Sequence, residues 1–265
     1  TLGKYLSYMQ NINWGIVFSL SYKFGIMNSH YDFLLDIFKY TNNDKKKTEF
    51  EDGSVEFENM NFKYSKDGDN ILTGLNLKIN DTEKVGLVGR SGSGKTSLTK
   101  LMIGLHKYEG SIKVGGQEVK TSNKDDLRSH INYVNQRTQL FNGNVIENMV
   151  YGNDASNEAV MQLLKKYNLN SVFSKLNNGI ESDVGVNGGQ LSLGMQKVVM
   201  IVRGILRKSK IIIFDEPLAG LDQDTRQRVI NMILEENNNK TVIVITHDKE
   251  ILPYMERVIN VNDYQ

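Results

Sequence analysis

The chain has 265 residues, a formal net charge of +1 and no cysteine. This length allows one or two domains with a sizeable core, and the small net charge argues against nucleic acid as the main partner. The absence of cysteine excludes disulfide bonds and cysteine-ligated zinc.

The first segment of interest is an uncharged stretch at residues 5–22, whose apolar content is reduced by asparagine, glutamine and serine. A bilayer span needs about 20 mainly apolar residues, so the stretch fits either an amphipathic soluble helix or the end of a membrane helix. It lacks the basic start and the cleavage site of a signal peptide. Helical spacing of apolar residues continues to Phe38. Residues 42–54 are polar and charged, which predicts a linker.

A glycine-rich motif follows a short apolar run at residues 85–88 and leads into a segment with helical periodicity. The motif ends in Gly94, Lys95 and Thr96, and strand, loop and helix start together are the context of a phosphate-binding loop. Backbone N–H groups at a helix N-terminus favour anions. We expect Lys95 to reach the β and γ phosphates of a nucleotide and Thr96 to offer its hydroxyl to Mg²⁺. The alternative is a glycine-rich turn that matches by chance. The residues expected to contact nucleotide from this loop are Gly89, Arg90, Ser91, Gly92, Ser93, Gly94, Lys95, Thr96 and Ser97.

Two further apolar runs end in polar residues that suit chemistry at a sheet edge. The run at residues 211–214 is followed by Asp215 and Glu216, and the run at residues 242–245 by Thr246 and His247. Runs this apolar predict strands covered on both faces of a parallel sheet, where ligands bind at the carboxyl ends. Asp215 is then suited to orient Mg²⁺, Glu216 to polarise an attacking water, and His247 to contact the γ-phosphate. The alternative is that the acids cap a strand and the histidine is structural.

These motifs, in this order, resemble the nucleotide-binding domain of ATP-binding-cassette (ABC) proteins over about residues 50–265. The resemblance implies that Gly89–Thr96 is the Walker A loop and that residues 211–216 are Walker B, with Glu216 as general base. It implies that Tyr64 stacks on adenine, although a tyrosine at a strand edge has the same local sequence. It also implies that Gln136 contacts Mg²⁺ and water and senses a membrane domain. Asp222 in "LAGLD" is then at a dimer seam, and His247 is the switch histidine.

The signature motif of this family has two candidates, "VNGGQ" and "LSLGM". In the family the last signature residue lies twenty positions before the Walker B aspartate, and Met195 lies twenty before Asp215. Exporters also carry "VG" seven residues before the signature leucine, and Val184 lies seven before Leu191. Both spacings identify residues 191–195, so Ser192 and Gly194 are expected to face the nucleotide of a partner cassette. Leu193 and Met195 depart from the LSGGQ pattern, and Val186 replaces a glutamate expected to help couple the cassettes to the membrane domain.

The resemblance narrows to exporters through residues 136–152, "QRTQLFNGNVIENMVYG", and it favours the membrane interpretation of residues 5–22. It implies an α/β P-loop NTPase core of RecA type with a mostly parallel sheet. An antiparallel β subdomain is expected near residues 54–79 and a helical insert at about residues 121–179. The expected division is the end of a transmembrane domain at 1–40, a linker at 41–54 and the cassette at 55–265. An exporter half-molecule would carry five more membrane helices before this point, so the chain is expected to be part of a longer protein or a truncated one.

The implied function is ATP binding and hydrolysis for an ABC exporter. ATP and Mg²⁺ are the expected ligands, and a second cassette and a transmembrane domain are the expected partners. The location is a membrane, with the cassette facing the cytoplasm. Two other functions are weighed beside it: a regulatory cassette that hydrolyses little, and a soluble ABC ATPase that does not transport. The imperfect signature leaves two assemblies open, a heterodimer with one slow site and a homodimer with two impaired sites.

Overall fold

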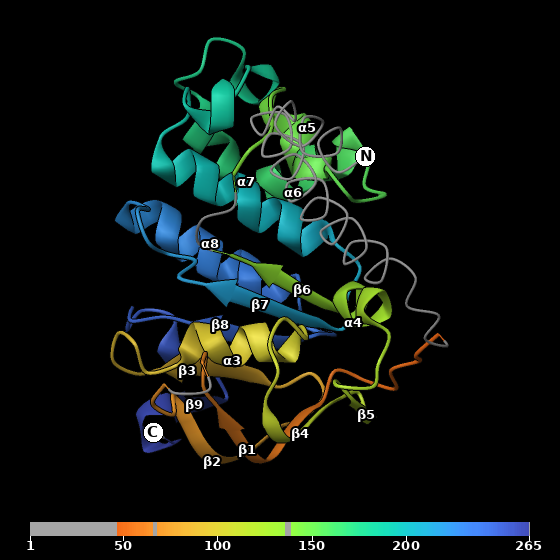
Figure 1. The fold of residues 1–265 in the computed structure, drawn as a ribbon. Helices are drawn as coiled ribbons and strands as arrows, with labels where there is room; N and C mark the ends of the chain where they lie inside the picture. Colours follow the sequence, from red (N-terminus) through yellow and green to blue (C-terminus); the bar gives the residue numbers. More distant parts are fainter. Residues whose placement is uncertain (1–46, 66–67, 136–138, 265) are drawn as a thin grey trace, which may run out of the picture. The chain divides into compact units, whose positions relative to one another are not determined.

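The computed structural model describes residues 47–65, 68–135 and 139–264. Two sheets organise them (Figure 1). The five-stranded sheet is parallel and has the order β6-β7-β8-β3-β9, with β6 at Ile131–Val134, β7 at Ile211–Asp215, β8 at Thr241–Ile245, β3 at Lys84–Val88 and β9 at Arg257–Asn260. The four-stranded sheet is antiparallel and has the order β2-β1-β4-β5, with β2 at Leu72–Ile79, β1 at Val55–Phe62, β4 at Glu109–Val114 and β5 at Gln117–Glu118.

The central strands are apolar throughout because both of their faces are covered. Alternate residues of β7 and β8 belong to different cores, since successive side chains of a strand point to opposite faces. Ile212 and Val244 pack with α7 (Leu193–Leu206) and α8 (Gln223–Glu235). Ile213 and Ile243 pack with α3 (Lys95–Met102) and the inner face of the antiparallel sheet. This three-layer packing confirms the expected parallel α/β core and the antiparallel β subdomain.

Short helices form the helical part, which lies at the end of Figure 1 opposite the antiparallel sheet. They are α5 (Val145–Val150), α6 (Asn157–Lys166) and the 3₁₀ helices η1 (Leu169–Phe173), η2 (Gly179–Glu181) and η3 (Val186–Gly188). Helix α5 packs against α7, and α6, η1 and η2 pack around α5 and one another. Side-chain caps fix where these helices begin. Asn144 and Glu147 form a capping box on α5, Ser156 caps α6 and Ser192 caps α7.

The expected start of the helical insert, residue 121, is wrong. Helix α4 (Lys124–His130) leads directly into β6, which pairs in parallel with β7 and belongs to the main sheet. The insert therefore begins only at α5. The prediction failed because β6, "INYV", is only four residues long, although its Ile131 and Val134 are buried in the sheet.

Residues 47–54 contact helix α4, although they fall in the segment that the sequence predicts as a linker. The Thr48 amide donates to Asp126 at 2.7 Å, and the Phe50 ring stacks on His130 with ring centroids 4.7 Å apart. The expected membrane segment (1–40) and the rest of the linker lie outside the described residues. Within residues 47–65, 68–135 and 139–264, no helix combines the length and the hydropathy of a membrane span. The structure also has short 3₁₀ helices η4 at Leu252–Tyr254 and η5 at Val261–Tyr264.

Candidate functional site

The glycine-rich loop connects the end of β3 to the start of α3. Gly94 is the N-cap of α3 and has φ +94°, and Gly92 has φ +83°. These are left-handed conformations that side chains rarely adopt. A Cβ on Gly94 would also lie 3.0 Å from the Ile71 side chain. The glycines therefore permit a backbone path that leaves the first N–H groups of α3 directed at the loop's concave side.

Lys95 is the first residue of α3, and its buried side chain turns back onto the loop. Its ammonium donates to the carbonyl oxygens of Gly89 at 2.7 Å and Arg90 at 2.8 Å. Burial lowers the pKa of the Lys95 ammonium, and the carboxylates of Glu216 and Asp215 oppose that shift. The cation is thus held where it can meet an anion without leaving the loop.

Asp215 ends β7 and is almost fully buried. Its Oδ2 accepts a hydrogen bond of 2.7 Å from the Tyr133 hydroxyl on the neighbouring strand β6. Burial, and then this bond to the carboxylate, raise the pKa of Tyr133, so the phenol stays protonated and remains a donor. The other carboxylate oxygen of Asp215 is not used by Tyr133 and is available to a ligand.

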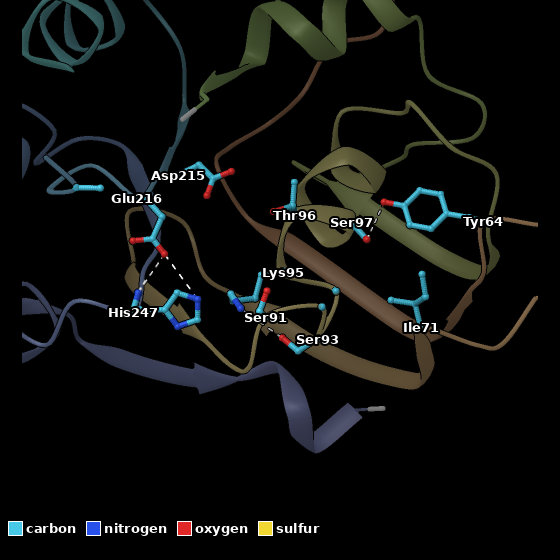
Figure 2. A pocket seen from close by; sticks show the side chains of 13 residues that line it. Tyr64, Ile71, Ser91, Ser93, Lys95, Thr96, Ser97, Asp215, Glu216 and His247 are labelled. Carbon is cyan, nitrogen blue, oxygen red and sulfur yellow. Dashed lines mark hydrogen bonds and ion pairs between the residues drawn. The ribbon is translucent and has the colours of Figure 1, made fainter. Parts of the chain in front are cut away.

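Glu216 has a left-handed backbone with φ +50°, a conformation that costs a non-glycine residue about 1–3 kcal/mol. Its amide donates to the Ile245 carbonyl at 2.8 Å, which ties it to β8. Its carboxylate accepts from the Thr246 hydroxyl at 3.2 Å and from the His247 amide at 3.2 Å. The imidazole Nε2 of His247 lies 3.8 Å from the same carboxylate. The strained backbone and these donors fix the carboxylate at the mouth of the loop (Figure 2).

These elements surround one pocket of about 710 Å³. Figure 2 shows its two ends: the carboxylates and His247 on one side of Lys95, and the aromatic ring of Tyr64 on the other. Tyr64 is about half exposed, and its hydroxyl lies 2.9 Å from that of Ser97 at the start of α3. The pocket thus has a cationic centre, an acidic end and an aromatic end. The lining residues are Tyr64, Ile71, Ser91, Gly92, Ser93, Gly94, Lys95, Thr96, Ser97, Asp215, Glu216, Ala219 and His247.

The donors present fit a Mg²⁺ ion held together with a phosphate. Thr96 offers an exposed hydroxyl, and Asp215 offers a carboxylate on the facing strand end. No group of three or more His, Cys, Asp and Glu side chains suited to a metal occurs among the residues described. Mg²⁺ commonly takes one or two protein carboxylates and completes its shell with water and substrate phosphate oxygens. Gln136, the other expected metal contact, lies outside the described residues.

Gly89 and Arg90, which are expected from the sequence to contact nucleotide, do not line this pocket and instead give their carbonyl oxygens to Lys95. The three residues expected at a dimer seam lie in a second pocket of about 600 Å³ and not in the first. Ser192, Gly194 and Asp222 line it together. A Cβ on Gly194 would come within 3.2 Å of the Gly220 carbonyl, so the start of α7 lies against the "LAGLD" loop. Asp222 caps α8 by accepting from the Thr225 amide at 3.0 Å, and this bond, with that of the Thr225 hydroxyl, lowers the pKa of Asp222.

The two residues that depart from the signature pattern differ sharply in exposure. Leu193 is 75% exposed, whereas Met195 is 9% exposed and packs in the core beneath α7. The "VNG" of the rejected candidate forms η3, which Gly189 caps at its C-terminal end. The Gln196 side chain donates to the Gly188 carbonyl at 2.9 Å and to the Leu191 carbonyl at 3.1 Å. The glycines of "VNGGQ" therefore build a turn that braces the signature segment.

Several residues near the first pocket escape the sequence analysis. Ile71 is an ordinary apolar residue of the lining that nothing in the sequence marks, and Ala219 lies in the "LAGLD" motif but is not expected from it to line the pocket. Tyr133 is found only once β6 is placed beside β7. Lys197 is a buried lysine on α7, and burial lowers its pKa against the attraction of Asp215 and Glu216.

Comparison with known proteins places these features in context. The family model described as "ABC transporter" matches residues 72–219. A Rickettsia bellii protein, named provisionally as an export ATP-binding/permease protein, is 35% identical over 73% of this chain and 34% of its own length. The ATP-dependent lipid A-core flippase of Francisella tularensis is 31% identical over 78% of this chain and 34% of its own length. The chain thus spans about a third of the length of these relatives.

A solved structure gives the same picture in three dimensions. The structure of a bacterial Atm1-family ABC exporter with ATP bound superposes with a TM-score of 0.75 and 28% identity. The match covers 83% of this chain and 39% of that one. Its extent shows that the two-sheet and helical arrangement described above is that of an exporter cassette.

Proposed function

Because the chain belongs to the ABC transporter family, we propose that it binds and hydrolyses ATP to power export across a membrane. The observation that carries this proposal is the position of Glu216. Its carboxylate lies in the same pocket as the Lys95 loop and is fixed by Thr246 and His247. A carboxylate fixed beside a phosphate-binding loop can accept a proton from an attacking water.

The site residues have complementary roles in this proposal. The loop N–H groups and Lys95 bind the β and γ phosphates, and Tyr64 stacks on the adenine at the other end of the pocket. Thr96, Gln136 and Asp215 would hold Mg²⁺, which would supply positive charge beside the phosphates during hydrolysis. Glu216 is the general base, and His247 contacts the γ-phosphate.

A second cassette completes the site. Ser192, Gly194 and Asp222 share a pocket that is separate from the Lys95 loop of their own chain. This separation supports a head-to-tail dimer in which each chain's signature segment faces the nucleotide of the other chain. Lys95 and Glu216 of one chain then act with Ser192 of its partner.

The exposed Leu193 favours a specific second candidate, an asymmetric heterodimer with one slow site. A branched side chain at this position hinders the close approach of backbone N–H groups to a phosphate that glycine would permit. Leu193 therefore slows hydrolysis of the nucleotide bound by the partner cassette. The Glu216 site of this chain would be completed by the partner's own signature, which would be intact. A homodimer would instead have two impaired sites.

The membrane role rests on the relatives named for export and on the exporter cassette that superposes. We assign residues 1–40 to the end of a transmembrane domain, 41–54 to a linker and 55–265 to the cassette, which would face the cytoplasm. The transmembrane domain is then the partner in which ATP hydrolysis is coupled to transport.

The test compares Glu216→Gln with Lys95→Ala in the full chain, assayed with its natural partner cassette. Glu216→Gln should bind ATP with the parent's affinity by calorimetry and lose roughly 10²–10⁴-fold in turnover, the usual contribution of a general base. Lys95→Ala should weaken ATP binding itself because it removes the charge that meets the phosphates. Parental turnover in Glu216→Gln would refute the assignment of the base, and unchanged ATP affinity in Lys95→Ala would refute that of the loop.

A further inference from the structure

Arg226 joins two segments that border the candidate site. It lies in the first turn of α8, directly after the "LAGLD" loop (residues 218–222). Its Nε donates to the Leu221 carbonyl of that loop at 3.1 Å. Its Nη1 donates to Asp248 Oδ2 at 2.9 Å and to Glu250 Oε1 at 3.1 Å, in the segment that follows His247. The side chains of Arg226 and Asp248 are only 26% and 17% exposed, so water screens this pair less than a surface ion pair.

The same contacts continue to the proposed base. The Asp248 amide donates to the Thr246 hydroxyl oxygen at 2.9 Å, and that hydroxyl donates to Glu216 Oε2 at 3.2 Å. A bond within the segment adds to this order, because the Glu250 amide donates to Asp248 Oδ1 at 2.9 Å. An unbroken series of hydrogen bonds therefore leads from the Leu221 carbonyl through Arg226, Asp248 and Thr246 to the Glu216 carboxylate.

We propose that Arg226 is a positioning residue for ATP hydrolysis, which fixes the Thr246–Glu250 segment and, through it, the Glu216 carboxylate. This inference rests on the proposed role of Glu216 as the base. The guanidinium suits the task because its planar fork can hold acceptors on two segments in a fixed relation. Since Asp222 adjoins Leu221 at the proposed dimer seam, a displacement of this loop on cassette closure reaches Glu216 through the same bonds.

The substitutions Arg226→Gln and Arg226→Lys distinguish the ion pairs of Arg226 from its hydrogen bond to the Leu221 carbonyl. Glutamine removes the charge that pairs with Asp248 and Glu250. Lysine keeps a charge that can pair with Asp248 but cannot also hold the Leu221 carbonyl in the same geometry. Arg257→Gln is the matched control, because Arg257 donates to both carboxylate oxygens of Glu83, at 2.8 and 3.2 Å, at the opposite end of β9 from the site.

The experiment measures ATP turnover, ATP affinity and amide hydrogen exchange in the full chain with its partner cassette. In Arg226→Gln, kcat should fall roughly 10–100-fold, by analogy with the loss of residues that orient the ligands of a catalytic metal, while ATP affinity stays at the parent's value. Arg226→Lys should recover part of kcat. In peptides containing Asp248 and Glu250, amide hydrogen exchange should be faster in Arg226→Gln than in the parent, and its rate should not change in Arg257→Gln.

Unchanged kcat in Arg226→Gln, or an equal loss in Arg257→Gln, would overturn the inference and leave the proposed function standing. Unchanged exchange at Asp248 and Glu250 would overturn it too, because the segment would then be held by other contacts. If Glu216→Gln turns over ATP at the parent rate, the assignment of the base fails and this inference fails with it, whereas absence of ATP turnover by the parent chain with its partner would refute the proposed function. In either case the exchange data still show whether Arg226 orders the segment.

Discussion

Replacing Leu193 by glycine should speed ATP hydrolysis by this chain when it pairs with itself. In such a homodimer every site would be completed by "LSLGM", so relief of the side chain acts on both sites. Loss of one preorganised donor of the oxyanion-hole type costs about 10²–10³-fold in rate. Because Ser192 and Gly194 are still present, we expect a gain at or below the lower limit of that range, roughly tenfold to a hundredfold.

The structure shows why this single change is cleaner than restoring the whole motif. Leu193 is 75% exposed, so only about a quarter of its side chain is buried. Burying a whole leucine side chain stabilises a protein by about 1.5–3 kcal/mol, so removing this one costs roughly 0.5 kcal/mol of stability. Glycine at the first position of α7 adds less than the about 1 kcal/mol that it costs inside a helix. Met195 is 9% exposed, and a glutamine there would bury an amide at a cost of about 1–3 kcal/mol. Stability losses would then obscure any gain from Met195→Gln.

The assay is phosphate release by the full chain at saturating ATP, with ATP-dependent dimerisation measured by size-exclusion chromatography. Met161→Gly removes an exposed apolar side chain from α6 and controls for the cost of glycine in a helix. Leu193→Ala should give an intermediate rate, since a Cβ remains. If Leu193→Gly dimerises with ATP yet releases phosphate no faster than the parent, the bulk of Leu193 is not the limiting defect.

Two further predictions concern stability. Lys197→Met should raise the free energy of unfolding in urea titrations without nucleotide, because burial lowers the pKa of the Lys197 ammonium, and so disfavours its charged form, despite the attraction of Asp215 and Glu216; a less stable variant would show that the charge is compensated. Burial, followed by the nearby Lys210, lowers the pKa of His130 below 6.5, so its contribution to stability is present above about pH 6.5 and is lost as the pH falls toward its folded pKa. The parent should therefore lose more thermal stability than His130→Phe between about pH 7.5 and about pH 5.5, and equal losses would contradict this.

Sequence patterns predict the strands that carry the site because burial on both faces leaves an uninterrupted apolar run. The runs before Gly89, Asp215 and Thr246 correspond to β3, β7 and β8. The carboxyl ends of parallel strands meet at one edge, so the proximity of Lys95, Asp215 and His247 also follows from the sequence.

Contacts that depend on strand order and on helix packing do not follow from the sequence. Tyr133 reaches Asp215 only because β6 pairs with β7 in a particular register, and "INYV" is too short to separate a core strand from the helical insert that follows. Arg226 and Asp248 are 22 positions apart and carry no shared motif. Their pairing results from the way α8 returns along the sheet, which local periodicity does not encode.

The pairing of β3 with β8 also determines at which stage of synthesis the pocket can first form. Lys95 follows β3 and His247 follows β8, and about 150 residues separate those two strands in sequence. Closing so long a loop costs entropy before any contact repays it, and structures dominated by such distant pairings fold slowly. On the ribosome, a nascent chain that has not yet exposed residues 241–245 lacks the strand that lies between β7 and β3, so its Lys95 loop and its Asp215 have no common sheet. The ability to hold nucleotide should therefore arise in a single late step of synthesis, and chain-release products that stop before β8 would have the complete glycine-rich loop and no pocket.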